Sequence, residues 1–208
     1  TDTFTFFLLF FYSNIIGLNP GLAGSAIFIA LCIDAITDPL MGTISDRTNS
    51  SFGRRHPYMF ISFIPMSLGY ILLFAPRQEW DMSQTDLFIW MTIFTVITRI
   101  GMTLFDIPHR AFGGEVTKDY KERTILMSWR EMFAWVAGLS NAFLGYGVFF
   151  ASTPEFPQGQ LNPDVWFPFA LTGAAIMVFS VLYSSQSTKD EINSLSKWSG
   201  AISLKDIF

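Results

Sequence analysis

The sequence predicts an all-α membrane protein with six transmembrane helices, and three observations support that fold class. Half of the 208 residues are hydrophobic. Only 14% are charged, whereas a water-soluble domain has nearer a quarter. The apolar residues also gather into six blocks, each about as long as the roughly 20 residues with which a helix crosses a bilayer. An ordinary soluble enzyme is therefore excluded.

Each predicted span is an apolar run that ends at residues which favour turns. The first run ends at Asn19-Pro20-Gly21, the second at the polar stretch before Pro57, and the third at Pro76. The fourth ends at the connection that begins with Gly113, and a loop with three prolines separates the fifth from the sixth. In chain order, the spans cover residues 3–18, 21–44, 58–76, 87–112, 125–150 and 166–184.

The two ends of the chain differ from the six spans. The first span is short and has neither an initiator methionine nor a basic flank before it, so we expect Thr1 to lie inside a helix that starts earlier. The tail, 186–208, has apolar residues at helical spacing, which predicts a cytoplasmic amphipathic linker. The expected organisation is a six-helix bundle over 1–185, with a truncated first helix, followed by this linker.

Lysine and arginine are unevenly distributed among the connections. Ten of them fall in the second connection, in the fourth connection with its flank, and in the tail, whereas Arg77 stands alone on the opposite side. Basic residues gather on the cytoplasmic side of membrane proteins. We therefore expect an integral protein of the inner or plasma membrane with both termini in the cytoplasm.

Other classes of function find no support in the sequence. One cysteine, Cys32, provides neither a disulfide framework nor a cysteine-rich zinc site. A net charge of -4 gives no basic surface for nucleic acid. The sequence has no phosphate loop, zinc-protease helix motif or nucleophile elbow, so we expect neither an enzyme nor an ATP-driven pump, and no cofactor.

Six charged residues interrupt the apolar spans. An insertion scale assigns a cost of about 2.5–3.5 kcal/mol to such a group at the centre of a membrane helix, so these residues must be paired or hydrated. By default they mark an ion or substrate path, and purely structural ion pairs are the alternative. They are Asp34 and Asp38 in the second span, Arg99 and Asp106 in the fourth, and Arg130 and Glu131 in the fifth.

Helical spacing places several of these groups on common faces. Asp34 and Asp38 are four residues apart, so their carboxylates project from one face about one turn apart. The fourth span carries four polar residues within a stripe roughly 60° wide. They are Arg99, Thr103, Asp106 and Arg110.

The fifth span combines a charged pair with small residues. Arg130 and Glu131 are adjacent but point about 100° apart, so Glu131 is expected to face the headgroup region or another helix. Four small residues predict a ridge for close packing against a neighbouring helix. They are Ala134, Gly138, Ala142 and Gly145.

The charge balance indicates a cation site. Asp34, Asp38 and Asp106 oppose only Arg99 and Arg130, and a bound monovalent cation would balance the surplus. Carboxylates, together with the hydroxyls of Thr37 and Thr103, are hard oxygen ligands that suit Na⁺ or proton exchange. The candidate coupling-cation site therefore consists of Asp34, Asp38, Thr103 and Asp106, with Na⁺ at the three carboxylates.

Two long motifs follow one another in the chain. The first is Asp34-Ala35-Ile36-Thr37-Asp38-Pro39-Leu40-Met41-Gly42, then Ser45-Asp46-Arg47-Thr48 and Gly53-Arg54-Arg55-His56-Pro57. The second is Asp106-Ile107-Pro108, then Gly114-Glu115, Asp119-Tyr120, Glu122-Arg123-Thr124 and Arg130. Together they resemble the glycoside–pentoside–hexuronide:cation symporters, the melibiose-carrier branch of the major facilitator superfamily. The resemblance covers essentially the whole chain in span count and order.

This resemblance implies a twelve-helix transporter with alternating access, of which the chain is the amino-terminal six-helix bundle, built from two inverted three-helix repeats. It implies coupling-cation ligands at Asp34, Asp38, Thr103 and Asp106, and substrate contacts at Asp106 and Arg130. The partners it implies are a small solute, the coupling cation, the lipid bilayer and a missing carboxy-terminal bundle. A conformational latch is implied at six positions: Gly42, which allows close helix approach, and Asp46, Arg47, Gly53, Arg54 and Arg55.

Two features depart from the melibiose-type pattern. The aromatic residue that stacks on the sugar stands four residues after the helix 4 aspartate, and this position is Arg110 here. Arg110 could favour an anionic substrate such as a uronide, or it could contact lipid headgroups. The helix 1 aspartate that holds sugar hydroxyls would precede Thr1.

The resulting interpretation is a secondary active symporter that couples Na⁺ or H⁺ to the transport of a glycoside, sugar or uronide. Two alternatives stay open. One is a carrier of the same fold for another solute class, such as a lysolipid or drug. The other is a self-contained six-helix channel or assembly protein.

Overall fold

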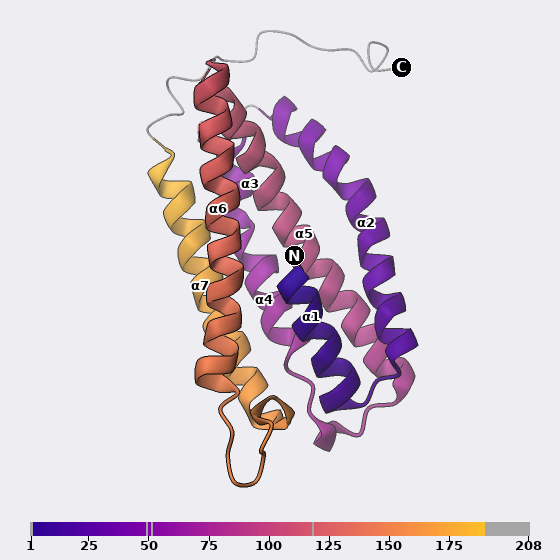
Figure 1. Ribbon diagram of the computed structural model, residues 1–208. Helices are drawn as coiled ribbons and strands as arrows, with labels where there is room; N and C mark the ends of the chain where they lie inside the picture. Colours follow the sequence, from indigo (N-terminus) through magenta and orange to yellow (C-terminus); the bar gives the residue numbers. More distant parts are fainter. Residues whose placement is uncertain (1, 49, 51, 118, 190–208) are drawn as a thin grey trace.

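The computed structural model describes residues 2–48, 50, 52–117 and 119–189, and these residues form helices and connections without any strand. The predicted all-α membrane fold is confirmed. Figure 1 shows long helices side by side, with the connections at the two ends of the bundle. The part of the tail from 190 to 208, with most of the predicted linker, lies outside the described residues.

All six predicted spans correspond to helical segments. The first is α1 (Asp2–Phe10) with the π-helical η1 (Phe11–Ile16), which ends at Gly17 in the left-handed conformation at φ 84°. The others are α2 (Pro20–Arg47), α3 (His56–Ile61) with α4 (Phe63–Leu73), α5 (Gln84–Val116), α6 (Tyr120–Leu144) with η3 (Gly145–Phe149), and α7 (Trp166–Ser187). Short 3₁₀ turns are η2 (Gln78–Trp80), η4 (Gly159–Leu161) and η5 (Pro163–Val165). Within the described residues, five helices are long and apolar enough to cross a membrane, and the helix from Phe4 to Ile16 is a shorter apolar one.

Several helices extend beyond the apolar runs that predicted them. α6 begins at Tyr120 because the Asp119 carboxylate accepts hydrogen bonds from the backbone N–H groups of Lys121 and Glu122. α5 continues through Pro108 as far as Val116. Hydropathy detects only the part of a helix that faces lipid or core, so polar turns at helix ends escape it.

The connections alternate between the two ends of the bundle (Figure 1). The α2–α3 and α5–α6 connections lie at one end, and the α1–α2, α4–α5 and α6–α7 connections lie at the other. Arg54 and Arg55 belong to the first end and Arg77 to the second. For the basic residues that the structure describes, the uneven distribution in the sequence therefore corresponds to two opposite ends of the molecule.

An aromatic core joins α1, η1, α4 and α7 near the end that carries Arg77. Its centre is the buried indole of Trp166, which is stacked on Phe74 with ring centroids 5.9 Å apart. Phe7, Phe11 and Phe150 pack around the same indole. Aromatic pairs add stability beyond their buried area, so this cluster anchors the bundle.

Two glycines allow a close contact between α4 and α5. A Cβ added at Gly101 would lie 2.5 Å from the backbone nitrogen of Met66, and one added at Gly69 would lie 2.5 Å from the Thr98 hydroxyl. Only glycine fits at these two points. By contrast, Ala134 of the ridge predicted on α6 is exposed, and Gly145 is the one member of that ridge that is buried. The predicted ridge is therefore not a close helix contact over most of its length.

Candidate functional site

α2 and α5 run parallel and in register. The backbone N–H of Asn19, which caps α2, donates to the side chain of Gln84 in the first turn of α5, and these residues are 65 positions apart. Two further contacts at mid-helix join residues with the same separation of 65. The polar residues that the sequence predicts on α2 and α5 therefore meet at matching depths.

The first contact is a buried ion pair between Arg99 and Asp34. Arg99 Nη1 lies 2.5 Å from Asp34 Oδ2, and only 8% of the Arg99 side chain and 19% of the Asp34 side chain are exposed. Asp34 Oδ1 and Arg99 Nε are buried without a hydrogen-bond partner in the described part of the chain. The pair thus neutralises both charges but leaves one buried acceptor and one buried donor unsatisfied.

One turn further along, Thr103 Oγ1 donates a hydrogen bond of 2.7 Å to Asp38 Oδ1. No lysine or arginine forms an ion pair with Asp38 within the residues described. Asp38 therefore presents a carboxylate, bonded to the Thr103 hydroxyl, that forms no direct ion pair, although Arg110 of α5 interacts with it electrostatically at longer range. Thr37 Oγ1 is instead directed to the backbone carbonyl of Asp34, at 3.4 Å.

Asp106 forms a second charged group with α6. Its Oδ2 lies 2.7 Å from Arg110 Nε on the same helix, and its Oδ1 lies 3.5 Å from Arg130 Nη1 across the gap between α5 and α6. Arg130 Nη2 also lies 2.5 Å from Glu131 Oε1. The expectation that Glu131 points away from Arg130 is wrong, because the long arginine side chain spans the angle between adjacent residues.

The three aspartates do not gather into one cluster in this conformation. Within the described residues, no three His, Cys, Asp or Glu side chains lie close enough to hold a metal ion together. Arg99 engages Asp34, and Asp106 turns toward Arg110 and Arg130. Cation binding by Asp34, Asp38, Thr103 and Asp106 stays a prediction, and so does substrate binding by Asp106, Arg110 and Arg130.

The sequence left the role of Arg99 open, and the structure supplies its partner. The signal was available in the register of the two helices: Asp34 lies 14 residues after Pro20, and Arg99 lies 15 residues after Gln84. Two opposite charges at equal depth in parallel neighbouring helices can pair. That inference requires knowing that α2 and α5 are neighbours.

The predicted latch residues lie at the end of the bundle away from Arg77. Arg55 Nη2 lies 2.6 Å from Asp46 Oδ1, which links the last turn of α2 to the residue before α3. Gly53 has φ 81°, a left-handed conformation that favours glycine. A Cβ at Gly42 would lie 3.8 Å from Ile107 Cγ2, an ordinary van der Waals distance. Arg47 is exposed at the end of α2.

The same end is joined to α7 through His56. Its Nε2 lies 3.1 Å from Thr188 Oγ1 and 3.2 Å from the Thr188 carbonyl oxygen. The His56 ring also packs edge-on against Phe112 of α5, with centroids 5.2 Å apart. His56 belongs to the first sequence motif, but its contacts with Thr188 and Phe112 were not predicted.

A bundle of membrane-length helices with charges paired between them is typical of a polytopic membrane protein whose interior charges serve a function. The family model described as "MFS/sugar transport protein" matches residues 1–200. The chain belongs to this family of the major facilitator superfamily, which the motifs around Asp34 and Asp106 predicted.

Relatives support the same assignment. The chain is 32% identical to an uncharacterized symporter of Synechocystis over 90% of its length and 35% of that protein. It is 30% identical to the sodium-dependent lysophosphatidylcholine symporter 1-A of Danio rerio, over 72% of its length and 28% of that protein. It is 22% identical to the isoprimeverose transporter of Lactiplantibacillus pentosus, over 91% of its length and 38% of that protein. The chain thus spans less than half the length of these relatives.

Proposed function

We propose that the chain is the amino-terminal bundle of a secondary active symporter that couples Na⁺ or H⁺ to the transport of a glycoside, sugar or uronide. The observation that carries the proposal is the Asp38–Thr103 pair. Asp38 is a carboxylate inside an apolar helix, and it forms no ion pair within the described residues, although Arg110 interacts with it electrostatically at longer range. The ion pair of Asp34 lies one turn away. Such a group inside a membrane helix needs a cation or a proton to be stable.

The coupling cation would bind at Asp38 and Thr103, with Asp34 Oδ1 as a further acceptor. The positive charge of the cation competes with Arg99 for Asp34 and makes the electrostatic potential beside Asp106 less negative. Asp106, Arg110 and Arg130 would then hold the solute, since carboxylates accept hydrogen bonds from hydroxyl groups and guanidinium groups bind carboxylates in pairs of hydrogen bonds. Each ligand shifts the conformational equilibrium only by its difference in affinity between the two states.

The proposal includes the rest of the protein. A carboxy-terminal six-helix bundle would close the transport path, and Gly42, Asp46, Arg47, Gly53, Arg54 and Arg55 would form the latch between the bundles on the cytoplasmic side. Both termini would lie in the cytoplasm of a cell inner or plasma membrane, as the distribution of basic residues indicates. The predicted linker, 186–208, would connect the bundles.

Uptake into proteoliposomes tests the proposal. The protein at full length is assayed with a panel of glycosides and uronides, with the Na⁺ gradient and the pH gradient imposed separately. We expect uptake of at least one solute to rise with one of the two gradients. Equal uptake with and without both gradients would contradict cation coupling.

A second solute class is supported by the lysophosphatidylcholine symporter among the relatives. Arg110 and Arg130, both beside Asp106, could bind the phosphate of a lysolipid as well as the carboxylate of a uronide. The same uptake assay with a lysolipid in the panel separates the two classes, because a sugar carrier should not take up the lysolipid.

A further inference from the structure

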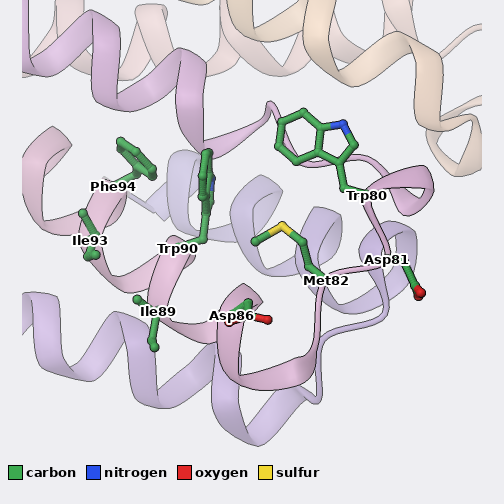
Figure 2. A pocket seen from close by; sticks show the side chains of 8 residues that line it. All are labelled: Trp80, Asp81, Met82, Asp86, Ile89, Trp90, Ile93 and Phe94. Atoms are coloured by element: carbon green, nitrogen blue, oxygen red, sulfur yellow. The ribbon is translucent and has the colours of Figure 1, made fainter.

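A surface pocket of about 560 Å³ lies where η2 leads into α5, at the end of the molecule that carries Arg77. Figure 2 shows the indoles of Trp80 and Trp90 on one side, the Met82 side chain close to them, Asp86 at the start of α5, and Asp81 on the loop beyond Met82. The pocket is separate from the charged site, because Trp90 precedes Arg99 by nine residues and so lies about 180° around the helix from it.

The aromatic wall of the pocket is built and held in place. The ring centroids of Trp80 and Trp90 lie 6.0 Å apart at an interplanar angle of 75°. Trp90 Nε1 donates a hydrogen bond of 2.8 Å to the carbonyl of Leu72, which fixes that ring. Trp80 is 48% exposed. Indole faces attract organic cations, with a strength that grows as water is excluded.

The charge of the pocket is negative. Asp81 and Asp86 line it, and no lysine or arginine does. Asp86 caps α5 by accepting from the backbone N–H and the hydroxyl of Ser83, so its charge partly offsets the positive end of the helix. Asp81, in the left-handed conformation at φ 45°, has no hydrogen bond or ion pair from its side chain within the described residues. The negative charge of Asp81 is therefore uncompensated.

The pocket continues into an apolar strip along α5. Ile89 and Ile93 are one turn apart, both line the pocket, and each is 48% exposed. From Asp86 to Ile93 the helix rises about 10 Å, at roughly 1.5 Å per residue. Along α5 the acidic Asp86 in the first turn is thus followed by Ile89, Trp90 and Ile93, and Trp80 covers the polar end of the strip from η2. This is the polarity gradient of a lipid with a cationic headgroup, and tryptophan is typical of the membrane–water boundary.

We propose that this pocket binds the ammonium headgroup of a phosphatidylethanolamine-type lipid in the membrane leaflet at this end of the bundle. The primary ammonium has N–H donors for a carboxylate of the pocket and a charge for the indole faces, whereas choline has no N–H donor. The acyl chain lies along Ile89 and Ile93, and the phosphate stays in water because no basic residue lines the pocket. The proposal does not depend on the proposed transport function.

Native mass spectrometry of the purified full-length protein tests the proposal. The dissociation constants of phosphatidylethanolamine, phosphatidylcholine and phosphatidylglycerol with identical acyl chains are compared. We expect the ethanolamine lipid to bind several-fold tighter than the other two. Asp81→Asn combined with Asp86→Asn should weaken its binding about tenfold, because charge-assisted hydrogen bonds are lost. Trp80→Leu should weaken it about threefold.

The matched control is Glu79→Gln combined with Asp164→Asn. It removes two carboxylates at the same end of the molecule that do not line this pocket, and it should leave binding unchanged. The test variants are expected to fold, because asparagine tolerates the left-handed conformation at position 81, and an asparagine at position 86 can still accept a hydrogen bond from Ser83. An unchanged midpoint of thermal unfolding checks this.

Three results would overturn the proposal. They are equal affinity for the three lipids, equal loss of binding in the test and control variants, and displacement of the lipid by soluble glycerophosphoethanolamine at an equal concentration. The last result would mean that a free amine, and not a lipid, is the ligand. Full transport activity with unchanged lipid affinity in the test variants would also reject this pocket while leaving the proposed function intact.

Discussion

Asp38 differs from the other aspartates of the charged site in having a hydroxyl as its partner and no guanidinium. Asp34 pairs with Arg99, and Asp106 pairs with Arg110 and Arg130. A carboxylate that forms no direct ion pair in an apolar helix binds a cation or takes up a proton more readily than one that is paired at close range. The residues of the site therefore have unequal roles.

Asp38→Asn should abolish stimulation of uptake by the Na⁺ or pH gradient while the protein still inserts and folds. The asparagine oxygen can still accept from Thr103, but the charge that attracts the cation is lost. Uptake in proteoliposomes under imposed gradients measures this, with the exposed Asp164→Asn as control. Normal stimulation in Asp38→Asn would place the cation elsewhere.

Asp34→Asn should act mainly on stability. It leaves the buried guanidinium of Arg99 without its partner, and breaking a buried pair typically costs about 3–5 kcal/mol, less any hydration from a water-filled cavity. Adding Arg99→Gln should restore most of the loss, because neither charge is then left alone. Thermal unfolding in detergent measures the three variants. Simple addition of the two single effects would show that the pair is not coupled.

Much of the charged site could be predicted from single residues. Asp34, Asp38, Asp106 and Arg130 were identifiable because each interrupts an apolar run, and their faces followed from helical spacing. The partner of Arg99 could not be assigned, because depth alone does not say which helices are neighbours. The position of Glu131 was predicted incorrectly, because backbone angles ignore the reach of a long arginine side chain.

At the scale of the elements, the parallel register of α2 and α5 organises the site. Contacts at the same separation of 65 residues occur at the first turn, at Asp34 and at Asp38, and Gly42 faces Ile107 at the same offset. The six helices and their order were predictable from hydropathy, whereas their capped polar ends were not. The close approach of α4 to α5 was also missed, since small residues on α6 fitted the expected pattern as well as Gly69 and Gly101 did.

Gly101→Ala should destabilise the bundle by on the order of 1–3 kcal/mol. The new Cβ would meet the Met66 backbone at 2.5 Å, so α4 and α5 would have to move apart. Gly24→Ala on α2 is the matched control, because nothing lies within 4 Å of its added Cβ and alanine favours helix. The midpoint of thermal unfolding should fall only in Gly101→Ala. An equal shift in both variants would indicate a general effect of alanine and no close contact.

At the scale of the whole molecule, the two ends of the bundle have different structures. One end is held by the aromatic core around Trp166. The other includes polar contacts, Asp46 with Arg55 and His56 with Thr188, beside the packing of His56 on Phe112. The Asp46 side chain is 53% exposed, so solvent screens its pairing with Arg55, whereas the rings around Trp166 are buried. Movement during a transport cycle should therefore occur more readily at the polar end.

Replacing both loop arginines, Arg54→Ala with Arg55→Ala, should slow turnover and leave equilibrium solute affinity nearly unchanged. Arg55 holds Asp46, which lies eight residues beyond Asp38, or about 12 Å along α2, and is too distant to contact a ligand there. Loss of the pair removes a contact that distinguishes one conformation from another, so the rates of exchange change while the binding groups stay in place. Substrate binding at equilibrium and the uptake rate are measured on the same preparation, with Lys121→Ala as a control that removes a basic residue at the same end. A large loss of affinity at unchanged turnover would mean that the loop belongs to the binding site. The separation of solute binding, near Asp38, from conformational exchange, at the loop that carries Arg54 and Arg55, would then be wrong.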